Sequence, residues 1–176
     1  MLDGDIPLLV TANRHQDIST ALRIAEEFDI PIVLDGAAEA YLLTDEIGAA
    51  GVPVIIHPMM ARAYGDRENI SFTTPRVLMD AGIPVAFQSG FENYVPKTRV
   101  LPWEAAISLA HGVAFDEALA AITLVPARIL GIDERIGSIT KGKDADLALF
   151  DGDPFEYTSH VTGVVIDGEV VSEVVR

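Results

Sequence analysis

The sequence predicts an α/β fold built on a parallel sheet, because a strand-like run recurs four times. Each run opens on an apolar residue and a proline: Ile6–Val10, Ile30–Leu34, Val52–Ile56 and Ile83–Phe87. The starts are 24, 22 and 31 residues apart, which is the length of one strand and one helix. Proline lacks an N–H and is tolerated where a strand begins. Apolar runs without alternation suit parallel strands that are buried on both faces.

Helices are expected between these strands. After the first run, apolar residues recur at helical spacing, at Ile18, Leu22, Ala25 and Phe28. Thr74 and Pro75 are typical of an N-cap followed by proline at the first helical position. A later helix, from about 116 to 130, carries Pro126 in its interior, which predicts a kink or break. Residues 58–71 form a loop longer than the usual connection and are a candidate lid.

The C-terminal part of the chain differs from the rest in composition and in its expected elements. The stretch that begins at Gly137 is rich in turn residues. Short strands are expected after it, at 147–150, 163–166 and 169–174. The last two are joined by Asp167-Gly168, which is a strong hairpin signal between β-prone runs. We therefore expect an α/β body over residues 1–135 and a small β module over residues 136–176.

Composition excludes several classes of function. The net charge of −15 argues against nucleic acid and against an anionic membrane surface as partners. The chain of 176 residues has no cysteine, so it has no disulfide, no thiolate metal site and no cysteine nucleophile. It has no apolar stretch long enough to span a bilayer, and its first residues are not typical of a signal peptide. These observations favour a cytoplasmic location without fixing it.

Polar residues gather just beyond the ends of the four expected strands. Parallel sheets bind ligands at the carboxyl ends of their strands. The candidates for a substrate pocket there are Asn13, Arg14, Asp35, Glu39, His57, Ser89 and Glu92. Because four strand ends converge in space, we expect a pocket for a small-molecule substrate or ligand.

These candidates have functional and structural interpretations. In the functional interpretation, Arg14 binds a carboxylate or phosphate through its planar guanidinium, and His57 is a general base or a metal ligand. In the structural interpretation, Asn13 and Ser89 cap helices, Arg14 pairs with Asp17, and His57 ends its strand in a satisfied environment. The sequence leaves both interpretations open.

Several segments of the second half resemble the amidohydrolase superfamily, and most of all its imidazolonepropionase-like members. They are the helix at 121–131, the run IGSITKGKDADL at 136–147, and the segments at 151–154 and 165–171. The resemblance implies the C-terminal half of a (β/α)8 TIM-like barrel, with four parallel strands and their helices at 1–135. It also implies that residues 136–176 are part of the small β-sandwich of these proteins.

The same resemblance implies a hydrolase of non-peptide C–N bonds that uses divalent metal ions such as zinc. In this family the fifth and sixth barrel strands end in metal-binding histidines, and the eighth ends in a catalytic aspartate. The matching positions here are Thr11, Asp35 and Gly90, and the His-x-His pair of the family's first strand has no counterpart. The usual ligands are therefore absent from the expected positions. Catalytic residues stay unassigned, and Asp35 and His57 are the remaining candidates for binding a metal.

Three functional hypotheses remain open. The chain is part of a hydrolase whose other half, the N-terminal half of the barrel, supplies the metal ligands. Alternatively, it is a non-catalytic half-barrel that binds a small molecule. In the third hypothesis it works by self-assembly, because unpaired strands at the edges of a sheet favour pairing with a second copy. The expected partner is therefore a second copy of the chain in a homo-oligomer, or the missing N-terminal half.

Overall fold

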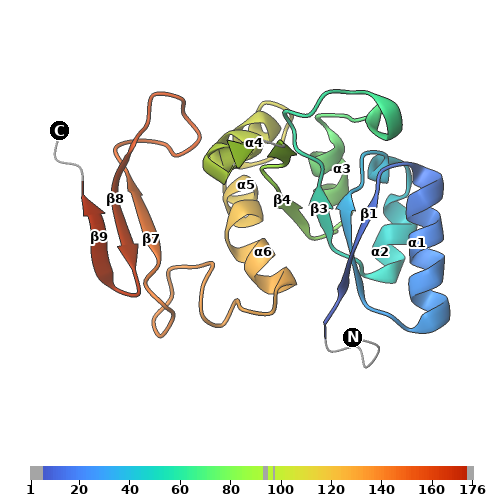
Figure 1. Ribbon diagram of the computed structural model, residues 1–176, viewed down its shortest axis with the longest axis horizontal. Helices are drawn as coiled ribbons and strands as arrows, with labels where there is room; N and C mark the ends of the chain where they lie inside the picture. Colours follow the sequence, from blue (N-terminus) through green and yellow to red (C-terminus); the bar gives the residue numbers. More distant parts are fainter. Residues whose placement is uncertain (1–5, 93–94, 97, 174–176) are drawn as a thin grey trace.

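The four expected strands form one parallel sheet in the computed structural model, which describes residues 6–92, 95–96 and 98–173 (Figure 1). They are β1 (Leu8–Ala12), β2 (Ile32–Gly36), β3 (Val54–Ile56) and β4 (Val85–Phe87), in the order β1-β2-β3-β4. The predicted α/β class is confirmed. Each strand begins one residue after its proline, so the missing N–H lies outside the ladder.

The first three strands are followed by helices. These are α1 (His15–Phe28), the short turn η1 (Ala40–Leu42), α2 (Thr44–Ala50), the turn η2 (Gly65–Arg67) and α3 (Thr74–Asp80). Helix α1 packs beside α2 and β1 (Figure 1) and buries Ile18, whereas Phe28 at its end is 63% exposed. The N-cap of α3 is Thr73, so the prediction of Thr74 was wrong by one residue. Pro75 is the second residue of the helix and not the first, so its predicted position is shifted by the same one residue.

A second group of helices follows β4. It consists of the turn η3 (Thr98–Val100), α4 (Leu101–Leu109), α5 (Phe115–Ile122) and α6 (Leu124–Ile129). The break predicted from Pro126 is confirmed, and it falls at Thr123, between α5 and α6. The reason for this position is steric, since the ring of a proline collides with the carbonyl four residues earlier, here that of Ile122.

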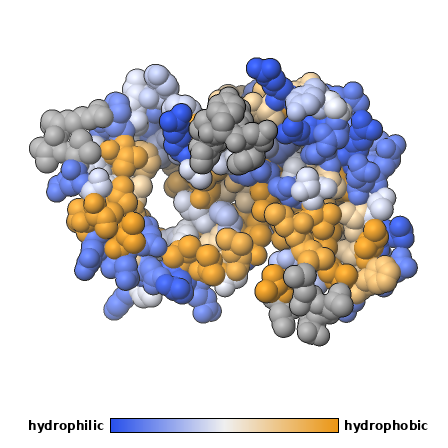
Figure 2. Space-filling view, in the orientation of Figure 1, coloured by the Kyte–Doolittle hydropathy of each residue, from blue (hydrophilic) through white to orange (hydrophobic). Residues whose placement is uncertain are grey.

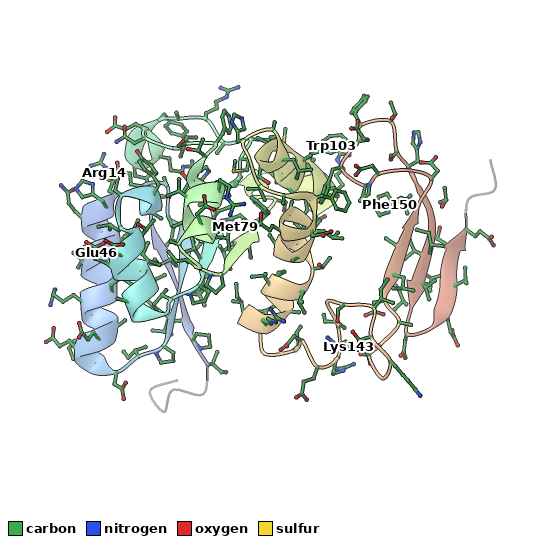
Figure 3. All side chains as sticks on the ribbon, turned by 180° about the vertical axis from the view of Figure 1, so that it is seen from behind. Arg14, Glu46, Met79, Trp103, Lys143 and Phe150 are labelled. Carbon is green, nitrogen blue, oxygen red and sulfur yellow. The ribbon has the colours of Figure 1, made fainter. Side chains whose placement is uncertain are left out.

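The C-terminal strands form a separate antiparallel sheet. Its strands are β7 (Leu147–Phe150), β8 (Val161–Ile166) and β9 (Glu169–Glu173). The predicted hairpin is confirmed, with φ angles of 51° at Asp167 and 81° at Gly168. Lys143, labelled in Figure 3, donates hydrogen bonds to the carbonyls of Asp133 and Ile136 and so fastens the connection that precedes β7. A minor pair, β5 (Phe91–Glu92) and β6 (Val95–Pro96), follows β4.

The two faces of the parallel sheet differ in chemistry. One face carries the apolar row Leu34, Val54 and Val85, whose members are register partners and belong to the core. The other face carries the row Thr11, Asp35, Ile55 and Ala86, also register partners. Side chains alternate between faces along a strand. Polar groups near the strand ends therefore come from the second face.

No helix among the described residues is long and apolar enough to cross a membrane.

Candidate functional site

Asp35, at the end of β2, is the centre of a hydrogen-bonded cluster. Thr11 on β1 donates from Oγ1 to Oδ2 of Asp35 over 2.7 Å. Gln88, one residue beyond β4, donates from Nε2 to Oδ1 of Asp35 over 2.8 Å. Both carboxylate oxygens therefore have donors within the fold, and three of the four strands are linked by side chains at this end of the sheet.

A cavity of about 240 Å³ lies over this cluster. Its lining residues come from all four strand ends and from the loop after β3: Thr11, Asn13, Asp35, Gly36, His57, Pro58, Asp66, Arg67, Gln88 and Gly90. Of the residues expected from the sequence, Asn13, Asp35 and His57 line this cavity together. Sequence reasoning missed Gln88. Its position two residues after Ala86, on the same face of the sheet, was the available signal.

His57 is buried at the wall of the cavity with one ring nitrogen unpaired. Its backbone N–H donates to the carbonyl of Gly36 over 2.7 Å, which extends the β2–β3 ladder and places the side chain on the face of Ile55. Nδ1 lies 3.0 Å from the carbonyl oxygen of Pro58. Nε2 has no hydrogen-bond partner among the described residues. Burial lowers the pKa of His57 below its usual value, and the Arg67 cation acts in the same direction.

Asn13 also lines the cavity and is hydrogen-bonded to the loop after β3. Its Nδ2 donates to Oδ2 of Asp66 over 2.7 Å, while its Oδ1 has no partner in the described part of the chain. That oxygen packs on Gly36, where a Cβ would lie only 2.6 Å away. Gly36 also has a φ of +81°. The close approach of Asn13 thus requires glycine at this position.

Glu39 holds the loop after β3 against the start of α1. Its Oε2 accepts from the backbone N–H of His15 over 2.7 Å and lies 2.6 Å from the Nδ1 of His15. Its Oε1 accepts from Nδ2 of Asn69 over 2.6 Å. The hydrogen bond from Asn69, followed by that from the His15 backbone, lowers the pKa of Glu39 from 4.5 to about 2. Glu39 is therefore a buried, ionised acceptor that connects the N-terminus of α1 to the loop after β3. It is not a lining residue of the cavity.

Other candidate residues lie around this pocket in different roles. Arg14, labelled in Figure 3 near the start of α1, is exposed and donates from Nη2 to the carbonyl of Gly65 over 3.5 Å. It forms no ion pair with Asp17 among those found in the described residues. Ser89 is half-buried between two lining residues. The backbone of Glu92 belongs to β5, but its side chain lies outside the described part of the structure.

The donor set does not fit a metal ion by itself. In residues 6–92, 95–96 and 98–173 no group of three or more His, Cys, Asp or Glu side chains is placed to hold one. Gly90, where the resemblance expects an aspartate, has a φ of +70°, and a Cβ there would lie 2.6 Å from Cγ of Pro58. A side chain could enter that position only if Pro58 moved. The described residues therefore bring fewer than three such side chains together at any one point, which is too few to hold a metal without further ligands.

A larger cavity of about 890 Å³ lies at the opposite end of the strands. Its lining includes Pro7, Pro31 and Pro53 at the strand starts and Arg128 and Ile129 of α6. The polar residues of the sheet face converge at the other end, and parallel sheets bind ligands there. The smaller cavity is therefore the better candidate for a ligand site.

Comparison with known proteins places this chain in a family. Residues 33–172 match the model of the amidohydrolase family. The amidohydrolase tasK of Hapsidospora irregularis is 29% identical over 90% of this chain and 17% of its own length. The imidazolonepropionase of Syntrophobacter fumaroxidans is 34% identical over 66% of this chain and 28% of its own length.

A solved structure of an amidohydrolase from Thermotoga maritima is 34% identical and superposes with a TM-score of 0.91. It covers 98% of this chain, which in turn covers 45% of that protein. The chain thus spans less than half the length of each of these relatives. With the family model matching most of the sequence, and with imidazolonepropionases among its relatives, the chain belongs to the amidohydrolase family.

Proposed function

We propose that this chain is part of a hydrolase that cleaves non-peptide C–N bonds of small molecules, and that the strand-end cavity is its substrate pocket. The observation that carries the proposal is the convergence of side chains from all four strand ends on one cavity. Membership of the amidohydrolase family supports the reaction class. The residues from this chain bind and orient the substrate, and any metal would need ligands beyond Asp35 and His57.

Two kinds of residue would have distinct tasks in this pocket. Asp35 is fixed by Thr11 and Gln88, so its charge stays in one place and gives the pocket a rigid floor. His57 keeps a free nitrogen and is available to a bound molecule. The loop that contains Asp66 covers the pocket and is held by Asn13.

Hydrolysis can be tested with the purified chain, alone and combined with an N-terminal half of the barrel, on a panel of small cyclic amides and ureas, with and without added Zn²⁺ or Mn²⁺. Mass spectrometry would detect the ring-opened product of a cyclic amide, which is heavier than the substrate by one water, or the diamine of a simple cyclic urea, which remains after the carbamic acid has lost CO2. The proposal expects such a product when the N-terminal half is present, and its loss when Asp35→Ala replaces the parent chain. The matched control, Asp116→Ala, removes an exposed carboxylate of α5 that does not line the pocket and should leave turnover unchanged. Turnover that survives Asp35→Ala would contradict the assignment of this pocket.

A second function, ligand binding without catalysis, is favoured by one specific observation. Both oxygens of Asp35 are already in hydrogen bonds, and the described residues offer no group of three metal ligands. A chain with such a pocket keeps the fold and can still bind a ligand, although it lacks the groups that hold a catalytic metal. Saturable binding without any hydrolysed product, even with added metal and the N-terminal half present, would select this function over the first.

We also propose that β1 pairs with further strands in the assembled protein, supplied by a second copy or by an N-terminal half. In the described residues β1 has a strand partner only on the β2 side. Ile6 and Leu9 are 65% and 61% exposed, and Figure 2 shows apolar surface over this region. A four-stranded sheet cannot close into a barrel. Native mass spectrometry would give the number of subunits, and a stable monomer of this chain would exclude pairing with a second copy.

A further inference from the structure

The loop between β3 and α3 lies outside the hydrophobic core. Met59 before it and Thr74 after it are each 0% exposed, but no residue from 60 to 73 is buried. None of these residues belongs to the core cluster. Segments that bury few apolar side chains open at a lower free energy than the core does. The position of this loop therefore depends mainly on polar contacts.

Within the loop, segment 61–73 folds back on itself (green in Figure 1, next to the start of α1). The backbone N–H of Arg67 donates to the carbonyl of Tyr64 over 3.1 Å, and that of Ile70 donates to the carbonyl of Arg67 over 3.3 Å. The Arg67 guanidinium also lies 5.5 Å from the ring centre of Tyr64, which is a cation–π contact. The segment can keep these internal contacts when it moves as a unit.

Two short side-chain hydrogen bonds join this segment to the rest of the protein. Nδ2 of Asn13 donates to Oδ2 of Asp66 over 2.7 Å, and Nδ2 of Asn69 donates to Oε1 of Glu39 over 2.6 Å. Asn13 and Glu39 are only 7% and 5% exposed, whereas Asp66 and Asn69 are exposed. Each bond therefore links a buried residue of the α/β body to an exposed residue of the segment.

The ends of the segment are fixed, and its remaining contact with the body is weak. The backbone N–H of Met60 donates to Oε2 of the buried Glu104 over 3.0 Å, and Thr74 is buried at the start of α3. Between these ends, Nη2 of Arg14 lies 3.5 Å from the carbonyl oxygen of Gly65, which is long for a hydrogen bond. The two short bonds are therefore the main restraint on the segment.

We propose that residues 61–73 are a lid on the strand-end cavity, and that the bonds Asn13–Asp66 and Asn69–Glu39 are the two latches that keep it closed. The segment contributes two of the residues that line the cavity, so its outward movement opens the cavity at the strand ends. A lid of this kind admits a ligand when open and shields it from water when closed. The inference concerns access to the cavity, and it holds whether or not hydrolysis follows.

The absence of cysteine from the chain makes a direct measurement of the lid possible. Glu68→Cys places a spin label on the exposed surface of the lid, and Ala49→Cys places a second one on the exposed surface of α2. Double electron–electron resonance on the full chain then gives the distribution of distances between the two labels. We expect one narrow distribution, which corresponds to the closed lid.

Two further substitutions remove the latches from the lid side and leave the buried residues of the body unchanged. They are Asp66→Ala and Asn69→Ala, both in the labelled chain. Each latch is a hydrogen bond to a carboxylate, so its loss should raise the ratio of open to closed lid by about tenfold or more. The double variant should show a second, separate distance. The control Arg62→Ala changes an exposed lid residue outside both latches and should keep the single distribution.

Three results would overturn the lid. The first is a double variant with the same single distribution as the labelled parent chain. The second is a control variant that opens as much as the double variant. The third is loss of the cooperative thermal unfolding transition in the double variant, because a segment outside the core can open without unfolding the body.

Discussion

Nδ2 of Asn69 lies 2.6 Å from Oε1 of Glu39, a hydrogen bond that joins two residues 30 positions apart. Glu39 is buried and also accepts from the first N–H of α1, at His15. One side chain therefore fastens the loop after β3 to the N-terminus of α1. The same loop is held a second time, where Asp66 accepts from Asn13. The loop after β3, which lines the pocket, is thus attached to the segment that follows the edge strand β1.

Replacement of Glu39 by alanine should release this connection. The change removes three short contacts to a charged acceptor, and hydrogen bonds to charged groups contribute about 1.5–3 kcal/mol. We expect Glu39→Ala to lower the free energy of unfolding by about 2 kcal/mol, measured by urea titration. The control Glu26→Ala removes an exposed carboxylate of α1 and should change this free energy by less than about 0.5 kcal/mol. Equal effects of the two variants would show that the contacts of Glu39 do not stabilise the fold.

Acid should destabilise the protein through the same carboxylate. The fold lowers the pKa of Glu39 from 4.5 to about 2, so the unfolded chain takes up a proton more readily than the folded one. The stabilisation is complete above pH 4.5 and is lost as the pH falls toward 2. Free energies of unfolding measured across this range should fall less steeply in Glu39→Ala than in the parent chain. Parallel curves for the two proteins would exclude Glu39 as a source of this dependence.

Alanine at position 36 should damage the pocket. Gly36 has a φ of +81°, and an added Cβ would lie 2.6 Å from Oδ1 of Asn13. The matched control is Gly51→Ala, where φ is +64° and no atom lies within 4 Å of the added Cβ. Backbone strain costs about 1 kcal/mol in both variants, and the contact with Asn13 should add about 1–2 kcal/mol in Gly36→Ala alone. Urea titration of both variants measures the two losses in the free energy of unfolding. Equal losses would show that the side chain of Asn13 moves aside without cost.

A substitution at Asp29, the C-cap of α1, should stabilise the protein. Asp29 caps this helix with a φ of 52°, a left-handed conformation that glycine adopts without strain, and its negative charge faces the negative end of the helix dipole. Asp29→Gly should raise the free energy of unfolding by about 1 kcal/mol. Asp29→Ala removes the charge but keeps the side-chain strain, and should gain less. Thermal unfolding of the two variants tests this order, and a destabilised Asp29→Gly would show that the carboxylate has a local partner.

Local sequence signals accounted for the elements of the fold. Proline at the start of each apolar run marks the four strands, Pro126 marks the break before α6, and Asp167-Gly168 marks the last hairpin. Each of these signals acts through the backbone within a few residues. Each strand starts two residues after the first residue of its run, because proline lies just before the ladder, where its missing N–H has no consequence.

Contacts between distant residues could not be predicted in the same way. Glu39, a candidate for the pocket, instead supports α1 through a contact that spans 24 residues. Arg14 was expected to pair with Asp17 in the structural interpretation, and it reaches the carbonyl of Gly65 instead. The first outcome depends on the path of the segment after β2 and the second on the path of the loop after β3, and no local pattern determines either path. The convergence of Asn13, Asp35 and His57 was predictable, because it follows from strand order alone.

The central claim is tested most directly by a crystal structure of the chain soaked with 2-imidazolidinone. The account predicts the ring in the strand-end cavity, among Asn13, Asp35 and Gln88. A ring bound only in the cavity at the strand starts, near Pro31 and Arg128, would contradict it.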